Sequence, residues 1–179
     1  MTTHPIIITG FMGSGKTTVA RALARILKYE ALDLDEVIAQ RERRTAKEII
    51  QTDGEPAFRE IETRTLYEVL KGVEEPNVGS VIALGGGTWT LERNRAIIGE
   101  YHCQTVWLDV AFDLCWKRIL ASGDQRPLAR NESEARELHV KRRDFYRRAN
   151  LHITPGEIMS VDDVAVEIAQ ALKNAGVES

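Results

Sequence analysis

Apolar residues are spaced along this chain in two alternating ways. Short runs rich in Val, Ile and Leu predict strands at 6–8, 31–34, 80–84, 105–108 and 151–153. Between them, apolar residues three and four positions apart predict helices at 17–27, 36–43, 46–51, 56–71, 91–98, 112–120, 133–148 and 161–172. Strands separated by helices are typical of an α/β sandwich, so we expect a mainly parallel sheet of about five strands.

Local signals mark where several of these helices begin. Thr45 with Glu48 three residues later predicts a capping box at the start of the third helix. Pro56 fits the first turn of the long helix that follows. Ser133 or a neighbouring residue is expected to cap the helix that runs to about Arg148.

Length and composition limit the class of protein. The chain has 179 residues, 43% of them hydrophobic, which suits one domain over residues 1–179 with a core at about 5–174. A net charge of −3 disfavours nucleic acid and anionic lipid as partners. The chain shows neither a secretory signal pattern nor an apolar run long enough to span a membrane, and Cys103 and Cys115 lack metal-site spacing. We therefore expect a cytoplasmic protein with reduced cysteines.

One motif stands out in this framework. Residues 10–18 read Gly-Phe-Met-Gly-Ser-Gly-Lys-Thr-Thr, directly after the apolar run Ile6–Ile8 and before a helical pattern. A glycine-rich turn in this context predicts a phosphate loop, whose main-chain N–H groups bind nucleotide phosphates. Lys16 is expected to reach the β- and γ-phosphates, and the Thr17 hydroxyl to ligate Mg²⁺. The sequence therefore predicts a nucleoside triphosphate site.

Unusual residues also follow the second and third predicted strands. Asp33 and Asp35 are two residues apart, so an extended backbone would project both to the same side. Gly85, Gly86 and Gly87 end the third strand, where either a ligand lies against the backbone or a tight bare turn is formed. The carboxyl ends of parallel strands lie at one edge of the sheet, so we expect one cleft to hold all of them. Helix capping is the alternative role for either aspartate.

Charged residues on the helices allow two interpretations each. Arg59 and Glu62 are three residues apart, close enough for an ion pair that is either part of the site or solvated. Arg118 lies in a group of surface cations. Trp89, just after the glycines, is either a packing residue or lines the acceptor pocket.

These residues together resemble the shikimate kinase family. The resemblance spans about residues 5–170 and rests on an ordered set of motifs: Gly10 to Thr18, Asp33-Leu34-Asp35, Phe58 to Glu62, Gly85 to Gly87, Arg126-Pro127-Leu128, and Arg142 followed by Tyr146. It implies a nucleoside monophosphate kinase-like fold with sheet order 2-3-1-4-5. The activity it implies is phosphorylation of the 3-hydroxyl of shikimate by ATP, in aromatic amino-acid biosynthesis.

The resemblance also implies roles for individual residues. ATP would be bound by Gly13, Ser14, Gly15, Lys16, Thr17, Thr18, Arg118 and Arg126. Mg²⁺ would be held by Thr17 and, through water, by Asp33. Shikimate would be bound by Asp35, Arg59, Gly85, Gly86, Gly87 and Arg142, with Glu62 holding Arg59 in place. The catalytic residues would be Lys16, Asp35 and Arg126, a lid would span about 122–133, and acceptor-binding helices would span about 34–72.

Two other functions share part of this pattern. A gluconate-type sugar-acid kinase has the same loop and fold but lacks the Asp-x-Asp, Phe-Arg-x-x-Glu and triple-glycine series. A non-catalytic kinase-like sensor need not keep Lys16, Thr17, Asp35 and Arg126 together. The expected partner is therefore a small molecule, shikimate, and the chain is expected to be a monomer.

Overall fold

A five-stranded sheet forms the centre of the protein. The computed structural model describes residues 4–73, 79–122, 131–156 and 159–176. The strand order is β2-β3-β1-β4-β5, and every neighbouring pair is parallel, so the predicted sheet and its order are confirmed. The strands are β1 (Ile6–Thr9), β2 (Glu30–Asp33), β3 (Ser80–Ala83), β4 (Gln104–Leu108) and β5 (Leu151–Ile153).

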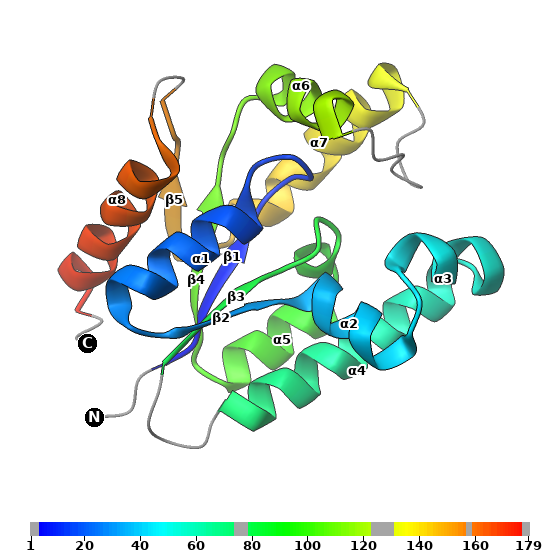
Figure 1. Ribbon diagram of the computed structural model, residues 1–179, viewed down its shortest axis with the longest axis horizontal. Helices are drawn as coiled ribbons and strands as arrows, with labels where there is room; N and C mark the ends of the chain where they lie inside the picture. Colours follow the sequence, from blue (N-terminus) through cyan, green and yellow to red (C-terminus); the bar gives the residue numbers. More distant parts are fainter. Residues whose placement is uncertain (1–3, 74–78, 123–130, 157–158, 177–179) are drawn as a thin grey trace.

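Helices cover both faces of this sheet (Figure 1). α1 packs against α8 and against β2 and β3, while α4 and α5 lie on the opposite side. The helices of the described residues are α1 (Lys16–Leu27), α2 (Leu34–Glu42), α3 (Ala46–Asp53), α4 (Glu55–Val73), α5 (Glu92–Glu100), α6 (Phe112–Ser122), α7 (Glu132–Tyr146) and α8 (Val161–Asn174), with the 3-10 turn η1 (Thr88–Thr90). None of these helices is both long and apolar enough to cross a membrane.

Burial follows the apolar pattern of the sequence. Every residue of the central strands β1 and β3 is buried, as expected for parallel strands that are covered by helices on both faces. The apolar stripes of α1, α4 and α8 complete one hydrophobic cluster around them. Removal of these side chains from water is the main stabilising contribution to the fold.

The end of β2 differs from the expectation. Asp33 is the last residue of the strand, and Leu34 already begins α2. The Asp33 carboxylate accepts hydrogen bonds from the main-chain N–H of Asp35, at 2.9 Å, and of Glu36, at 3.3 Å, so it caps the helix. The prediction that both aspartates lie on extended backbone is therefore wrong for Asp35, which is in the first turn of α2.

Side-chain caps also mark the starts of α3 and α7. The predicted capping box of Thr45 and Glu48 is confirmed. α7 is capped by Asn131, whose side-chain oxygen accepts from the Glu134 N–H at 2.9 Å, rather than by Ser133. This helix ends at Tyr146, slightly before the predicted end.

Candidate functional site

The loop between β1 and α1 has the backbone of an anion-binding turn. Gly13 and Gly15 have φ angles of 75° and 92°, which side chains other than glycine rarely adopt. A methyl group on Gly13 would lie 2.6 Å from the Cys115 carbonyl oxygen, so there is also no room for a side chain at this position. Gly15 caps α1 without a side-chain hydrogen bond, and the first turn of α1 has no acidic residue. The N–H groups and the positive end of the helix dipole are therefore suited to an anion.

Polar side chains of this loop surround the same turn. The Lys16 ammonium donates to the Phe11 carbonyl at 2.9 Å, across the mouth of the loop. The Ser14 hydroxyl is buried and has no hydrogen-bond partner among the described residues. A buried hydroxyl without a partner is costly, so Ser14 is consistent with a loop that is completed by a ligand.

Arg118 lies beside this loop on α6. Its guanidinium donates to the carbonyls of Gly13, at 3.4 Å, and Ser14, at 3.3 Å. It also lines a cavity of about 240 Å³, here called the Arg118 pocket, together with Thr18 and Gly15. The remaining lining is mostly apolar and comes from the phosphate loop, α1, the end of the β4–α6 connection, α6 and the segment before and within α8: Ser14, Val19, Val110, Leu114, Pro155, Gly156, Met159, Ser160, Val161 and Val164.

Asp33 joins this loop to the second strand. Its second carboxylate oxygen accepts a hydrogen bond from the Thr17 hydroxyl, while the first caps α2. The capping role and the position beside Thr17 are thus compatible, because the two oxygens serve different partners. A hydroxyl and a carboxylate in contact are oxygen ligands of the kind that Mg²⁺ prefers. Within the described residues, no cluster of three or more His, Cys, Asp or Glu is placed to hold a metal ion.

The glycine triplet brings the second group of predicted residues together. A methyl group on Gly85 would lie 3.0 Å from an Asp35 carboxylate oxygen, and one on Gly86 would lie 3.4 Å from the Arg142 guanidinium. On Gly87 it would lie 2.4 Å from the Arg59 guanidinium. Side chains from α2, α4 and α7 thus lie close to this backbone, and a ligand in contact with the three glycines stays a prediction.

Arg142 is a buried cation. Only 7% of the residue is exposed, and no carboxylate lies within ion-pair distance of it in the part of the chain that the structure describes. Burial lowers the pKa of Arg142 from its ordinary value, although arginine stays charged near neutral pH. The neighbouring Tyr146 hydroxyl donates to the Gly86 carbonyl at 2.5 Å, and burial raises the pKa of Tyr146 to about 12. A buried cation of this kind favours an anionic ligand.

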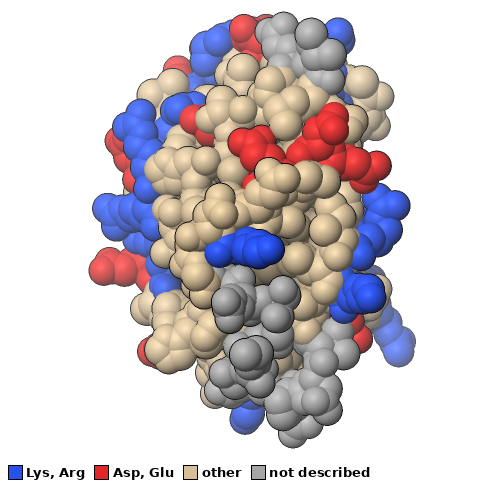
Figure 2. All heavy atoms as spheres, turned by 90° about the vertical axis from the view of Figure 1, so that its left-hand side faces the viewer, with Lys and Arg blue, Asp and Glu red and all other residues tan. Residues whose placement is uncertain are grey.

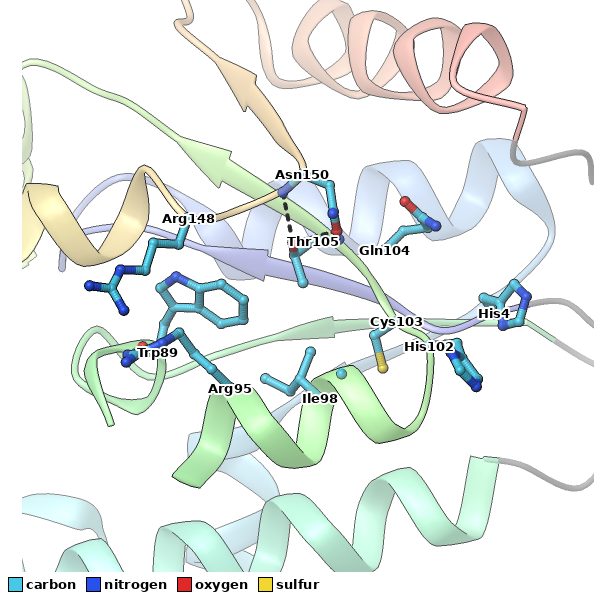
Figure 3. Close-up of a pocket in the computed structure, with 11 residues that line it drawn as sticks. His4, Trp89, Arg95, Ile98, His102, Cys103, Gln104, Thr105, Arg148 and Asn150 are labelled. Carbon is cyan, nitrogen blue, oxygen red and sulfur yellow. Dashed lines mark hydrogen bonds between the residues drawn. The ribbon is translucent and has the colours of Figure 1, made fainter. Parts of the chain in front are cut away.

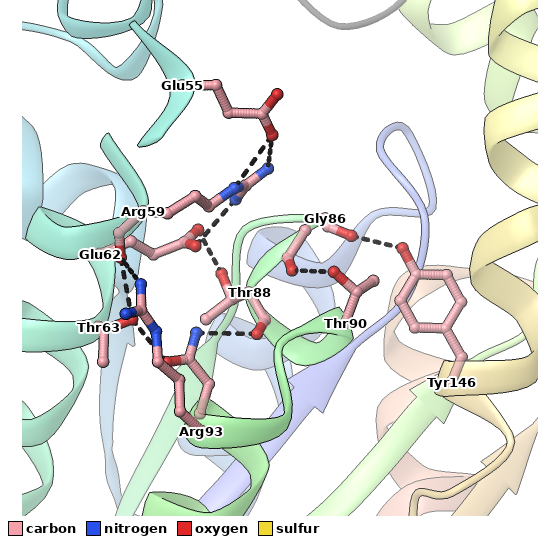
Figure 4. A network of polar contacts seen from close by, with 11 residues as sticks. Glu55, Arg59, Glu62, Thr63, Gly86, Thr88, Thr90, Arg93 and Tyr146 are labelled. Carbon is pink, nitrogen blue, oxygen red and sulfur yellow. Dashed lines mark hydrogen bonds and ion pairs between the residues drawn. The ribbon is translucent and has the colours of Figure 1, made fainter. Parts of the chain in front are cut away.

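Arg59 is held by carboxylates on two sides (Figure 4). Its guanidinium donates to Glu62 at 2.8 Å and to Glu55 at 2.9 and 3.2 Å, so the predicted pair with Glu62 is confirmed. Glu62 is 1% exposed, and its other oxygen accepts from the Thr88 hydroxyl at 2.6 Å, so this is no solvated surface pair. Burial alone disfavours the charged Arg59, but the Glu62 and Glu55 carboxylates outweigh it and raise the pKa of Arg59.

The two arginines line one cavity of about 450 Å³, here called the Arg59–Arg142 pocket. Three polar residues that line this pocket escaped the sequence analysis: Glu55, Lys141 and Thr90. Glu55 precedes Arg59 by four residues on α4, a helical spacing that could have revealed it. Lys141 and Thr90 carry no comparable signal in the sequence, and neither does Thr88, whose hydroxyl donates to Glu62.

Two predicted residues are not placed in this site. Arg126 lies outside the described residues, as does most of the proposed lid. Trp89 is 4% exposed, and its indole N–H donates to the Phe145 carbonyl at 2.9 Å. It lines a different cavity and not the Arg59–Arg142 pocket. Of the two interpretations of Trp89, the structure therefore supports packing.

Comparison with known proteins agrees with this geometry. The sequence pattern that defines the family described as shikimate kinase matches residues 12–173. The chain belongs to the shikimate kinase family. A shikimate kinase of Cereibacter sphaeroides is 38% identical over 93% of this chain and 81% of that protein. One of Geobacter sulfurreducens is 40% identical over 92% of this chain and 88% of that protein.

Solved structures give the same result. Shikimate kinase from Acinetobacter baumannii in complex with shikimate superposes with a TM-score of 0.88 at 31% identity, over 99% of this chain and 97% of that one. A gluconokinase from Sinorhizobium meliloti 1021 superposes with a TM-score of 0.66 at 15% identity, over 99% and 98%. The gluconokinase therefore shares the fold, whereas the shikimate kinase shares the family.

Proposed function

We propose that this protein transfers the γ-phosphoryl group of ATP to the 3-hydroxyl of shikimate. One observation carries the assignment: two guanidinium groups and the Asp35 carboxylate meet at the glycine triplet, beside the phosphate loop. Membership of the shikimate kinase family supports it. A relative of the same family, from Acinetobacter baumannii, has been solved in complex with shikimate.

The nucleotide phosphates would be bound by the phosphate loop. Main-chain N–H groups of Gly13, Ser14 and Gly15 and the start of α1 supply fixed dipoles, and Lys16 supplies a charge. The Arg118 pocket, with its apolar lining and its guanidinium, is suited to the adenine ring. Thr18 lines the same pocket. Bound ATP supplies the phosphoryl group that is transferred.

Thr17 and Asp33 would hold Mg²⁺. Their side chains are in contact next to the phosphate loop, which fits a cation bound through the Thr17 hydroxyl and, through water, the Asp33 carboxylate. Because Asp33 also caps α2, its position is fixed before the cation binds. The cation would neutralise charge on the phosphates during transfer.

The acceptor would be bound by its carboxylate. Arg142 offers a buried guanidinium without a carboxylate partner among the described residues, and Arg59 is oriented by Glu62. Planar guanidinium groups bind a carboxylate through two parallel hydrogen bonds, and the Gly86 and Gly87 backbone closes the same side. Asp35 would orient or deprotonate the 3-hydroxyl. Residues 34–72, which contribute Asp35 and Arg59, would form the acceptor-binding helices.

Arg126 and the lid remain predictions from the family pattern. The lid, at about 122–133, would close over the phosphates and bring Arg126 to the transferred group. Closure of this kind excludes water and completes the charge balance around the phosphates.

The test is an ADP-release assay with shikimate, gluconate and quinate as alternative acceptors. We expect ADP formation that depends on shikimate, with a kcat lowered by at least about a hundredfold in Asp35→Asn. Preference for gluconate would support the sugar-acid kinase instead. ADP formation that ignores every acceptor, or no ADP formation, would support the sensor and refute the proposal.

We also propose a monomer that acts in the cytoplasm on a small molecule. The formal net charge of −3 opposes association with a polyanion. Figure 2 shows acidic side chains grouped on the face at the left-hand side of Figure 1. Light scattering on the purified chain is expected to give the mass of one copy, and a mass of two copies would contradict the monomer.

A further inference from the structure

Arginines without a carboxylate partner among the described residues mark the two pockets described above. Most described arginines form ion pairs: Arg21, Arg25, Arg41, Arg44, Arg59, Arg64, Arg93, Arg136, Arg143 and Arg147. Arg118 and Arg142 form no ion pair with any described residue. Arg118 lines the nucleotide pocket, and Arg142 lines the acceptor pocket. Arg43 is exposed at the end of α2. The two that remain, Arg95 and Arg148, lie together in a third cavity.

This cavity, the Arg95–Arg148 pocket, is an open trough of about 640 Å³ (Figure 3). Its described lining carries four side chains that are basic or can become so, and no carboxylate. The floor is apolar, from Trp89, Ile98 and Cys103. The lining residues are His4, Trp89, Arg95, Ile98, Gly99, His102, Cys103, Gln104, Thr105, Arg148 and Asn150.

The two guanidinium groups converge at one end of the trough. The Arg95 guanidinium lies 5.4 Å and the Arg148 guanidinium 5.7 Å from the centre of the same Phe145 ring. Arg95 is fixed by its hydrogen bond to the Trp89 carbonyl, at 2.7 Å. Figure 3 shows both side chains reaching toward Trp89. The positive charge of Arg148 acts on Arg95, so the two guanidinium groups repel each other, and an anion bound by both would relieve that repulsion.

Electrostatic effects on Arg95 agree with this arrangement. Burial lowers the pKa of Arg95, and the positive charge of Arg148 lowers it further. The nearby carboxylate of Glu92 acts in the opposite direction but forms no ion pair with Arg95 among the described residues. Arg95 and Arg148 thus share one aromatic ring and no carboxylate among the described residues, which is the geometric basis of the proposal.

We propose that the Arg95–Arg148 pocket binds a small organic anion through a carboxylate or phosphate group. Arg95 and Arg148 bind the oxygens, and the rest of the ligand lies over the apolar floor toward Cys103. The volume of the trough exceeds that of an inorganic phosphate, which favours an organic ligand. The two pockets share no lining residue: Trp89 lines the Arg95–Arg148 pocket, whereas Phe145 lines the acceptor pocket.

The experiment follows the indole N–H signal of Trp89 by NMR during titration with benzoate or phenyl phosphate. Saturating shikimate and Mg-ADP are present, so that both probes are kept out of the kinase site. The indole N–H is a local reporter, because it donates to the Phe145 carbonyl beneath the two arginines. We expect a saturable shift with at least one probe, and the tighter probe identifies the chemical group.

Matched variants decide whether the arginines carry the binding. Arg95→Gln with Arg148→Gln should weaken binding at least about tenfold, since two charged hydrogen-bond donors are lost. Arg147→Gln is the control, because Arg147 is exposed, pairs with Asp144 at 3.0 Å and does not line the trough. If the double variant does not fold, Arg148→Gln alone serves, since Arg148 is exposed.

Two results would overturn the proposal. One is the absence of any saturable shift with either probe, and the other is unchanged binding in the arginine variants. Shikimate-dependent ADP formation is measured in parallel and should persist in all of these variants. Loss of that activity in the parent protein would count against the kinase assignment, and not against this pocket.

Discussion

Replacing Arg142 by methionine is expected to stabilise the fold while weakening acceptor binding. Arg142 is 7% exposed and has no carboxylate within ion-pair distance among the described residues. Burial lowers its pKa, which means that the folded state disfavours the charged form. The proton is lost only near the alkaline end of the pH scale, so the full penalty is present at neutral pH.

The magnitude follows from the cost of burying a charge. That cost amounts to several kcal/mol and is partly offset here by the Tyr146 hydroxyl. The free energy of unfolding of Arg142→Met should therefore exceed that of the parent by about 1–3 kcal/mol. For a chain of this size the melting temperature should rise by about 2–10 °C. Loss of a charged hydrogen bond to the acceptor carboxylate costs about 1.5–3 kcal/mol, so the Kd for shikimate should increase about 10- to 150-fold.

Arg143→Met provides the matched control. The Arg143 guanidinium binds Asp109 through two hydrogen bonds, at 2.5 and 2.7 Å. Its removal leaves that carboxylate unpaired and should destabilise the fold by about 1–3 kcal/mol without changing shikimate affinity. Calorimetric melting and titration calorimetry measure both quantities. The reasoning fails if Arg142→Met has as low a melting temperature as Arg143→Met and the same Kd for shikimate as the parent protein.

Three further perturbations test other contacts. Thr88→Val removes the hydroxyl that donates to Glu62 and should raise KM for shikimate about tenfold with little change in KM for ATP. Thr88→Ser keeps a hydroxyl and should restore the KM for shikimate. An equal rise of KM for shikimate and for ATP in Thr88→Val would refute the positioning role. Gly87→Ala places a methyl group 2.4 Å from the Arg59 guanidinium and should also raise KM for shikimate, and an unchanged KM would show that Arg59 moves aside freely. Burial lowers the pKa of His139, so the unfolded state takes up a proton first as pH falls, and the free energy of unfolding should decline below about pH 6.5. His139→Gln should make the free energy of unfolding, measured by urea titration, depend less steeply on pH. An equally steep pH dependence in the variant would exclude His139 as its cause.

Local interactions explain what could be read before the structure. The phosphate loop, the capping box at Thr45 and the parallel arrangement of the strands depend on residues that are close in sequence or on a repeated apolar spacing. The end of β2 could not be read in this way. An apolar run and a helix start overlap at Leu34, and the hydrogen bonds of the Asp33 side chain decide between them.

The sequence by itself determined the fold class and the glycine-rich loop and predicted most of the residues of the Arg59–Arg142 site, because these follow from short motifs and from their order along the chain. Only the tertiary structure decided that Glu62 is buried against Thr88, that Arg142 lacks a carboxylate partner among the described residues, and that Arg95 and Arg148 converge on one ring. The physical reason is that burial and pairing of a charge depend on how distant helices pack. Sequence spacing reports only the neighbours on the same helix or strand.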